Sequence, residues 1–157
     1  MSAILRPDPG EAWSVAPMRP DEIDAIEAVE RVVYEFPWTA GNFRDSLNSG
    51  YQGVLLRVDG AMAGYAIQMY AIDEAHLLNI TIVPAFQRLG HGSRLLQWLM
   101  DVARSRRMTS MFLEVRPSNA KAQSMYTRFG FGQVGIRRDY YPARDGRENA
   151  LVLTARL

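Results

Sequence analysis

The chain has 157 residues and a formal net charge of +1, with 48% hydrophobic residues, 22% charged residues and no cysteine. This length and composition suit one globular domain with a hydrophobic core, and the near-neutral charge argues against bulk nucleic-acid binding. The lack of cysteine excludes disulfides, thiolate metal sites and a cysteinyl acyl-enzyme. No apolar run approaches the ~18 residues of a membrane span, and no signal-peptide core is recognisable. We therefore expect a cytoplasmic protein that binds neither nucleic acid nor a membrane.

The first half of the chain predicts an arm, a strand, two helices and a hairpin. Prolines interrupt residues 1–12, which we expect to form a loosely ordered arm ahead of a single domain over 13–157. Apolar residues at helical spacing predict a helix over 20–35, and Thr39 suits the N-cap of a second, short helix. Asp59-Gly60 lies between two β-rich segments and is a strong hairpin signal. The strands expected in this half cover 13–18, 53–58, 61–72 and 76–83.

The second half predicts helices alternating with strands and a closing strand pair. A long amphipathic helix is expected first. A strand over 110–116 then leads to a helix that Ser118 is expected to cap and Gly130 to terminate. The last two strands, 131–141 and 148–157, are expected to pair across a longer loop. The order β-αα-βββ-α-β-α-ββ predicts a single-domain α/β fold, with a mixed, mostly antiparallel sheet and helices on both faces.

The segment over residues 79–92 predicts a phosphate-binding turn. It reads as a β-branched strand, then a polar turn with Gly90 and Gly92, then the start of the amphipathic helix. The first N–H groups of a helix lack internal partners and carry partial positive charge, so they bind anions. Lys121 is the only lysine and lies far from this turn, which excludes a P-loop. Leu95 stands where a dinucleotide fingerprint needs its third glycine.

Two residues of the second half are candidates for chemistry. Glu114 lies in an apolar strand, where a carboxylate fits either an ion pair with Arg116 or a general base. Tyr126 lies on the apolar face of its helix, where most tyrosines are core residues whose hydroxyl has found a partner. The residues alone leave both alternatives open.

Two aromatic groups are candidates for acceptor binding. Phe36-Pro37-Trp38 and Tyr140-Tyr141 fit either a clamp around a peptide backbone or a cap on the end of the sheet, because rigid aromatic rings suit both. The two histidines, His76 and His91, have no second histidine or carboxylate at ligand spacing. We therefore expect no metal.

Several motifs resemble a known family. Gln87-Arg88-x-Gly90-x-Gly92 resembles the acetyl-CoA pyrophosphate loop of the GNAT N-acetyltransferases. The ribosomal-protein-alanine N-acetyltransferases (RimI) are similar to this chain in Phe36-Pro37-Trp38, Phe112-Leu113-Glu114-Val115-Arg116, Asn119, Tyr126, Gly130-Phe131 and Arg137-Arg138-x-Tyr140-Tyr141-Pro142. The resemblance covers about residues 13–157. It departs from the family at Val83, where a polar residue is usual, and in the arm.

The resemblance implies a role for each matching residue. Glu114 would be the proton acceptor and Tyr126 the proton donor. The residues that would contact acetyl-CoA are Ile80, Thr81, Ile82, Arg88, Leu89, Gly90, His91, Gly92, Ser93 and Asn119. Those that would contact the acceptor are Phe36, Pro37, Trp38, Tyr140 and Tyr141.

The expected activity is therefore acetyl-CoA-dependent acetylation of the N-terminal alanine of a small-subunit ribosomal protein. Transfer would be direct, in a ternary complex, with the enzyme a monomer or weak dimer. One alternative is a GNAT acetyltransferase that acts on lysine side chains or on a small-molecule amine. A second alternative, from another class, is a non-catalytic acyl-CoA-binding module.

Overall fold

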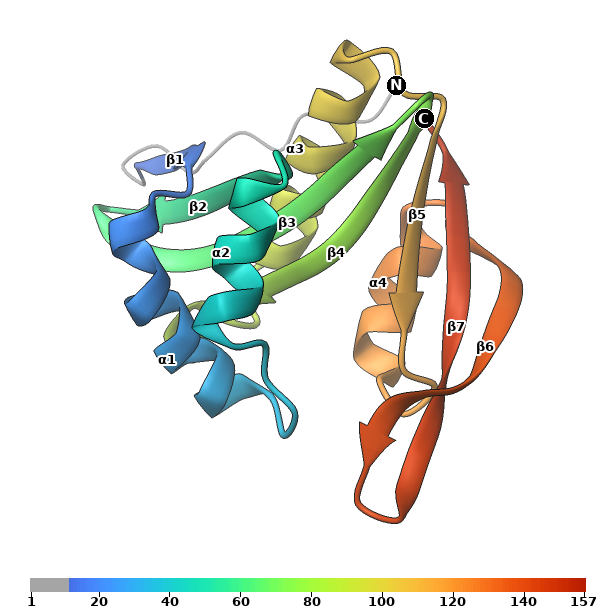
Figure 1. Ribbon diagram of the computed structural model, residues 1–157. Helices are drawn as coiled ribbons and strands as arrows, with labels where there is room; N and C mark the ends of the chain where they lie inside the picture. The colour runs from blue at the N-terminus through green and yellow to red at the C-terminus, as the bar shows by residue number, and fades with distance from the viewer. Residues whose placement is uncertain (1–11) are drawn as a thin grey trace. The chain divides into compact units, whose positions relative to one another are not determined.

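The computed structural model of the chain describes residues 12–157, which divide into two compact units (Figure 1). The first unit runs up to Met69 and includes Asn79–Leu99, and the second comprises Tyr70–Leu78 and Met100–Leu157. The arm expected over residues 1–12 lies outside the described residues, except for Ala12.

The strands form one sheet that contains both parallel and antiparallel pairs. The elements are β1 (Trp13–Pro17), the 3₁₀ turn η1 (Pro20–Glu22), α1 (Ile23–Val33), α2 (Ala40–Asn48), β2 (Gln52–Val58), β3 (Ala61–Ala71), β4 (Glu74–Ile82), the 3₁₀ turn η2 (Pro84–Phe86), α3 (His91–Ser105), β5 (Ser110–Val115), α4 (Ala120–Arg128), β6 (Gly132–Ala143) and β7 (Gly146–Arg156). Among the described residues, seven strands are hydrogen-bonded in the order β1-β2-β3-β4-β5-β7-β6. Strands β4 and β5 pair in parallel, whereas β1–β2, β2–β3, β5–β7 and β6–β7 are antiparallel. The predicted element order and the mixed, mostly antiparallel sheet are confirmed.

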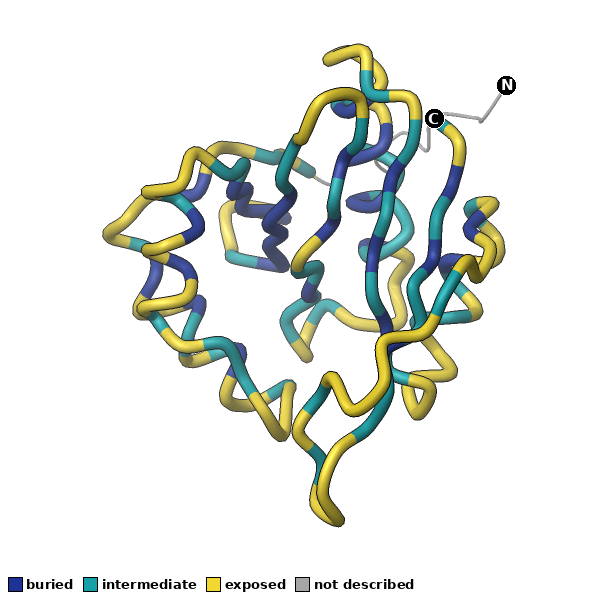
Figure 2. Tube along the Cα trace, turned by 45° about the vertical axis from the view of Figure 1, so that its right-hand side comes forward, coloured by how far each residue is buried: buried dark blue, intermediate teal, exposed yellow. Residues whose placement is uncertain are grey.

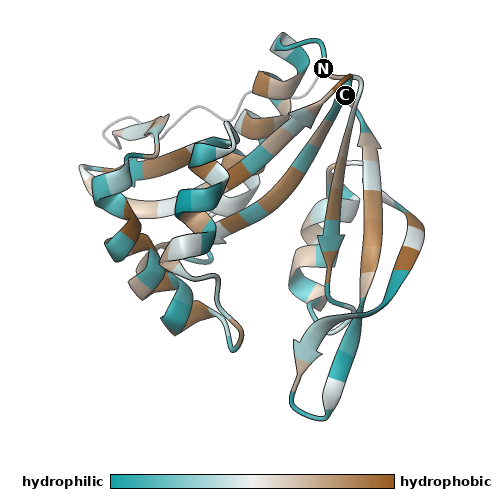
Figure 3. Cartoon of the chain, viewed as in Figure 1, coloured by the Kyte–Doolittle hydropathy of each residue, from teal (hydrophilic) through white to brown (hydrophobic). Residues whose placement is uncertain are grey.

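In the first unit, helices α1 and α2 cover one face of the strands. Ile26 of α1 and Phe43 of α2 pack with Leu55 of β2 and Tyr65 of β3, and all four side chains are buried. On the opposite face, the Gln68 side chain of β3 donates to a main-chain carbonyl of α3 at 3.4 Å. Buried and hydrophobic positions accordingly recur along these strands (Figures 2 and 3). Because successive strand residues point to opposite sides, these strands present side chains to helices on both faces.

The predicted helix cap, hairpin turn and helix end are present in the structure. The Thr39 hydroxyl accepts the Asn42 N–H at 3.1 Å, and the Asn42 side chain accepts the Thr39 N–H at 2.9 Å, which makes a reciprocal cap for α2. At the β2–β3 turn, Asp59 and Gly60 have φ of +51° and +83°. Gly130, which follows α4, has φ of +88°. These left-handed residues are those that a tight hairpin and a helix end require.

Two expectations for the second unit are wrong. Asn119, not Ser118, caps α4, because the Asn119 side-chain oxygen accepts an N–H of the first helical turn at 3.2 Å. Ser118 instead bonds Glu148 of β7 through both its N–H and its hydroxyl. The longer loop expected between the last strands is a two-residue turn, since β6 runs on to Ala143, opposite Gly146.

None of the helices within residues 12–157 combines the length and the apolar character that a membrane crossing requires.

Glu148 ties β7 to the loop ahead of α4. Its carboxylate accepts the hydroxyl and the N–H of Ser118, both at 3.0 Å, and lies 3.2 Å from the Arg116 guanidinium. The hydrogen bond from the Ser118 hydroxyl is the largest of the interactions that lower the pKa of Glu148. The folded protein therefore holds this carboxylate in its charged form more strongly than the unfolded chain does.

We expect Glu148→Gln to weaken the acid sensitivity of the fold. A lowered folded-state pKa adds stability that is present above the unfolded pKa of ~4.3 and is lost as the pH falls through the folded value. The thermal midpoint of the wild type should fall across this window, and that of Glu148→Gln should fall less. Thermal melts from neutral to strongly acidic pH measure the difference, with Glu74→Gln as a matched loss of one carboxylate. Equal falls in all three proteins would contradict the assignment.

Candidate active site

The predicted phosphate-binding turn of the first unit presents main-chain donors. Arg88 and Gly90 have left-handed φ of +63° and +84°. The Gly90 carbonyl accepts the Arg94 N–H at 3.1 Å, which places the N–H groups that begin at His91 in the first turn of α3. These N–H groups lack intrahelical acceptors and suit an anion. A Cβ on Gly90 would meet no atom within 4 Å, so glycine serves there for its φ rather than for space.

The side chains around this turn differ in exposure. His91 is 2% exposed, and its ring lies edge-on to Phe86 with 6.2 Å between centroids. Leu89, in contrast, is 65% exposed. The Gln87 side chain donates to the Ile82 carbonyl at 3.0 Å and so joins the turn to the end of β4. Of the residues expected to contact acetyl-CoA, His91 can therefore do so only through its main chain.

The end of β4 is held from within the first unit. The Thr81 side chain is buried, and its hydroxyl lies 2.7 Å from the Tyr34 hydroxyl and 2.8 Å from the Asn79 side-chain oxygen. Burial raises the pKa of Tyr34 to about 12, so its hydroxyl stays a hydrogen-bond donor at neutral pH. Gly64 of β3 allows the close approach, because a Cβ there would lie 2.7 Å from the Thr81 carbonyl oxygen. Thr81 can therefore serve acetyl-CoA only through its main chain.

The segment Phe36-Pro37-Trp38 follows α1 in the same unit. The Trp38 ring packs against Phe43 with 5.2 Å between centroids, and the main-chain N–H of Trp38 donates to the Glu30 carboxylate at 3.1 Å. The Phe36 side chain is 39% exposed. Trp38 is thus a core-packed residue whose neighbour Phe36 reaches solvent.

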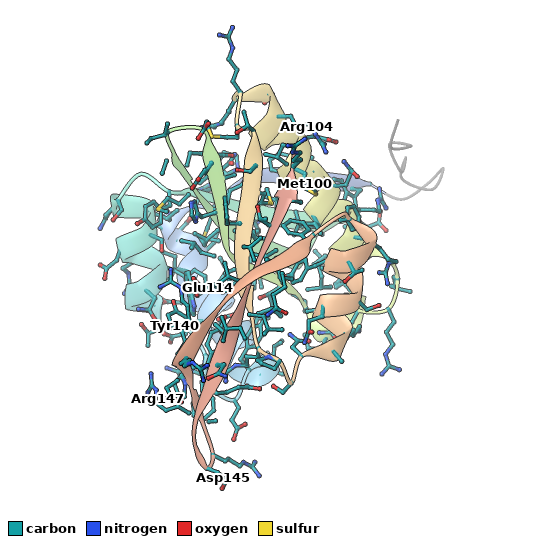
Figure 4. All side chains as sticks on the ribbon, turned by 90° about the vertical axis from the view of Figure 1, so that its right-hand side faces the viewer. Met100, Arg104, Glu114, Tyr140, Asp145 and Arg147 are labelled. Carbon is teal, nitrogen blue, oxygen red and sulfur yellow. The ribbon has the colours of Figure 1, made fainter. Side chains whose placement is uncertain are left out.

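In the second unit, Glu114 pairs with Arg137 and not with Arg116. The Glu114 carboxylate lies 2.9 Å from the Arg137 guanidinium, and its side chain is 25% exposed. It also accepts a hydrogen bond from Tyr140, its neighbour in Figure 4. Arg116 is engaged elsewhere, 3.2 Å from Glu148. The ion-pair alternative was right about the type of interaction and wrong about the partner.

Strand register explains the Glu114–Arg137 pair. Glu114 lies opposite Val152 on β7, and Arg137 on β6 lies opposite Ala150. Because residues two apart on a strand share a face, all four side chains lie on one face of the sheet. The small Ala150 side chain lets Arg137 cross β7 to reach the carboxylate.

Tyr126 is a core residue of the second unit. Its side chain is 7% exposed, and its ring meets Phe131 edge-on with 5.6 Å between centroids. The core alternative therefore holds for the ring, and the role of the hydroxyl as proton donor stays a prediction. Asn119, expected to contact acetyl-CoA, uses its side-chain oxygen in the α4 cap.

Tyr140 and Tyr141 form a paired aromatic group on β6. Their rings lie at 77° with 4.9 Å between centroids, and Arg116 lies 4.3 Å from the Tyr141 centroid. Burial, followed by the negative charge of Glu114, raises the pKa of both tyrosines. Both hydroxyls therefore remain protonated and able to donate hydrogen bonds at neutral pH.

The amino-acid sequence alone does not reveal the roles of two charged residues beside these groups. Arg137 was part of a matched motif, but its partner follows from the sheet register. Glu30 could have been found, because it lies on the same helical stripe as Ile23 and Ile26 and is buried with them. Within residues 12–157, no three histidine, aspartate or glutamate side chains converge as metal ligands would.

Known proteins provide an independent comparison. The model of the Acetyltransferase (GNAT) family matches residues 4–131. The [ribosomal protein bS18]-alanine N-acetyltransferase of Escherichia coli (strain K12) is 36% identical over 140 residues, covering 89% of this chain and 95% of that protein. The protein of the same description from Salmonella typhimurium is 38% identical over 132 residues, covering 84% and 89%.

Solved structures agree with this match. The crystal structure of the ribosomal-protein-S18-alanine N-acetyltransferase from Escherichia coli aligns with a TM-score of 0.86 at 35% identity, over 92% of this chain and 94% of that one. Ard1 from Thermoplasma volcanium aligns with a TM-score of 0.82 at 23% identity, over 93% and 98%, and supports the fold alone. The chain therefore belongs to the GNAT acetyltransferase family, whose members use acetyl-CoA as the acetyl donor.

Proposed function

We propose that this protein acetylates the α-amine of the N-terminal alanine of ribosomal protein bS18, with acetyl-CoA as the donor. The observation that carries the proposal is the similarity, over nearly the whole chain, to proteins described by that activity. The local geometry of each unit adds support. The first unit presents the anion-binding turn, and the second places Glu114 beside Arg137 and Tyr140.

In the proposed reaction, the first unit binds the donor. Main-chain N–H groups of residues 88–93 hold the pyrophosphate of acetyl-CoA, as helix N-termini hold other phosphates. A main-chain N–H of β4, near Thr81 or Ile82, stabilises the oxyanion that develops on the thioester carbonyl. Asn119 supplies a further contact to the coenzyme.

Glu114 and Tyr126 carry the proton transfers in this proposal. An α-amine has a pKa of ~7.7–8.0, so about a tenth of it is neutral at pH 7, and Glu114 takes the proton directly or through one water. The neutral nitrogen attacks the thioester carbon, the C–N bond forms as the C–S bond breaks, and Tyr126 protonates the departing thiolate. The acylated nitrogen then loses its second proton to water, and the Tyr126 phenolate regains a proton from water, so that the products are the acetylated peptide, the thiol form of coenzyme A and one released proton. Because the chain has no cysteine, transfer is direct, and we expect sequential kinetics.

The acceptor peptide is proposed to contact both aromatic groups, Phe36-Pro37-Trp38 and Tyr140-Tyr141. Rigid rings supply contact area at low conformational-entropy cost, and the protonated hydroxyl of Tyr141 can donate to a peptide carbonyl. The acceptor expected in this proposal is an unfolded N-terminus with a small first side chain.

We expect the wild-type enzyme to add a single acetyl group to a peptide with the N-terminal sequence of bS18, on its α-amine. Three peptides test this: one with a free N-terminal alanine, one with a blocked α-amine and an internal lysine, and one with a bulky first residue. Mass spectrometry counts and locates the acetyl groups, and only the first peptide should react efficiently.

Other outcomes would identify another function. Acetylation of the lysine in the blocked peptide would favour a lysine or small-amine acetyltransferase. Tight binding of acetyl-CoA without turnover on any amine would favour a non-catalytic acyl-CoA-binding module.

A further inference from the structure

Glu30 of α1 is a buried carboxylate that the proposed reaction does not use. Its residue is 1% exposed. Its Oε1 accepts the Trp38 N–H at 3.1 Å and the Asn79 side-chain amide at 3.3 Å. Its Oε2 accepts the Tyr65 hydroxyl at 2.5 Å and lies 3.4 Å from the Thr81 hydroxyl. One side chain thus joins the segment after α1, the core strand β3 and the end of β4.

We propose that Glu30 is a positioning residue that fixes the acceptor-binding segment Phe36-Pro37-Trp38 to β4. This inference rests on the proposed function, because that function assigns acceptor binding to this segment and the thioester to β4. Glu30 touches neither reactant in the proposal. It acts through Trp38 and through Asn79, which both donate to the same carboxylate oxygen.

The chemistry of the pocket explains why a carboxylate stands there. Three donors, from Trp38, Asn79 and Tyr65, converge on the two oxygens, and the Thr81 hydroxyl lies near one of them. An ionised carboxylate accepts hydrogen bonds at both of its oxygens, whereas an amide side chain accepts at only one atom. Hydrogen bonds to a charged acceptor are also roughly twice as strong as neutral ones, which restrains the Trp38 backbone firmly. A general base, in contrast, would need an oxygen open to the substrate amine, and both Glu30 oxygens are occupied.

Burial works against the charged form of Glu30. Burial raises the pKa of Glu30 despite the hydrogen bonds from Tyr65, Trp38, Asn79 and Thr81 that oppose the shift. A buried charge is often no more stable than an apolar side chain of similar size. The titratable groups that face Glu30 are Tyr65 of β3 and, through Thr81, Tyr34, and both remain neutral at physiological pH.

The two ends of the bridge are not equally dependent on Glu30. On the β4 side, Thr81 also contacts Asn79 at 2.8 Å and Tyr34 at 2.7 Å, so this strand keeps other restraints. The main-chain N–H of Trp38, in contrast, donates directly to Glu30. Loss of the carboxylate should therefore loosen the acceptor-binding segment more than it loosens β4.

Three variants test the proposal. Glu30→Met removes the acceptor at similar volume, and Glu30→Gln keeps an oxygen for Trp38 and Asn79, while the hydroxyls of Tyr65 and Thr81 can turn to accept from its amide. Tyr65→Phe is the matched control, because it removes a core hydrogen bond to the same carboxylate and leaves the Trp38 bond in place. The measurements are acceptor KM, acetyl-CoA Kd, the thermal midpoint and hydrogen exchange of the Trp38 amide.

In Glu30→Met we expect the acceptor KM to rise about tenfold and Trp38 exchange to accelerate by a similar factor, because an unpaired amide is left behind. The acetyl-CoA Kd should change less than ~3-fold, because β4 keeps hydrogen bonds that do not involve Glu30 and that still hold the strand in place. Glu30→Gln should restore the KM and the exchange protection. Tyr65→Phe should lower the thermal midpoint without moving either.

The results separate this inference from the proposed function. Should the wild type act on a different amine, KM is measured for that amine, and Trp38 exchange reads the restraint without any turnover. Unchanged exchange and KM in Glu30→Met would overturn the positioning role. So would a rise in KM in Tyr65→Phe that matches its loss of stability, because the effect would then be a general one.

Discussion

Glu114→Gln is expected to lower kcat by roughly 10²–10⁴-fold, the usual contribution of a positioned general base. The amide cannot take the proton of the acceptor α-amine, but it keeps the size of the side chain, and its oxygen can still accept from Arg137, which lies 2.9 Å from the wild-type carboxylate. We therefore expect little change in the thermal midpoint. Steady-state kinetics with the bS18 peptide measure the loss.

The pH dependence sharpens this test. An α-amine has a pKa of ~7.7–8.0, so above about pH 9 most of the acceptor is already neutral and the need for a base falls. The ratio of wild-type to variant kcat should therefore shrink as the pH rises. Glu74→Gln, which removes another partly exposed carboxylate of the second unit, is the matched control and should retain wild-type kcat. A Glu114→Gln enzyme with the kcat of this control would remove Glu114 from the mechanism.

Tyr126→Phe is expected to lower kcat about 10²-fold, near the lower end of the range for a general acid, because the thiolate would have to leave unprotonated. The peptide KM should stay close to the wild-type value, since the residue is proposed to act on the leaving group. The ring contact with Phe131 does not involve the hydroxyl, so the fold should persist.

A second tyrosine provides the control for this variant. Tyr70 is a half-buried tyrosine of the same unit that packs against Arg106, 4.8 Å from its ring centroid. Tyr70→Phe should leave kcat unchanged. If Tyr126→Phe behaved like Tyr70→Phe in kcat, the proton donor would have to be another group, and Tyr126 would be a core residue only.

The caps and turns that depend on only a few neighbouring residues are predictable from the sequence. Thr39 capped α2, Asp59-Gly60 made the β2–β3 turn and Gly130 ended α4, because each of these depends on local backbone angles and one or two nearby bonds. The cap of α4 is the exception. Ser118 and Asn119 are both good N-cap residues, and the distant Glu148 engages Ser118 and leaves the cap to its neighbour.

The sequence by itself determined the order of the elements, the glycine turn at the start of α3 and the identity of Glu114 and Tyr126 as candidates. These follow from the residue types and their spacing along one stretch of chain. Only the tertiary structure decided that Arg137 pairs with Glu114, because that contact crosses β7 and depends on the register of two strand pairs. The same holds for Glu30, whose polar neighbours come from segments up to 51 positions away and meet only when α1 packs on the sheet. The sequence does not distinguish a solvated carboxylate from a buried one, because burial is a property of the folded chain.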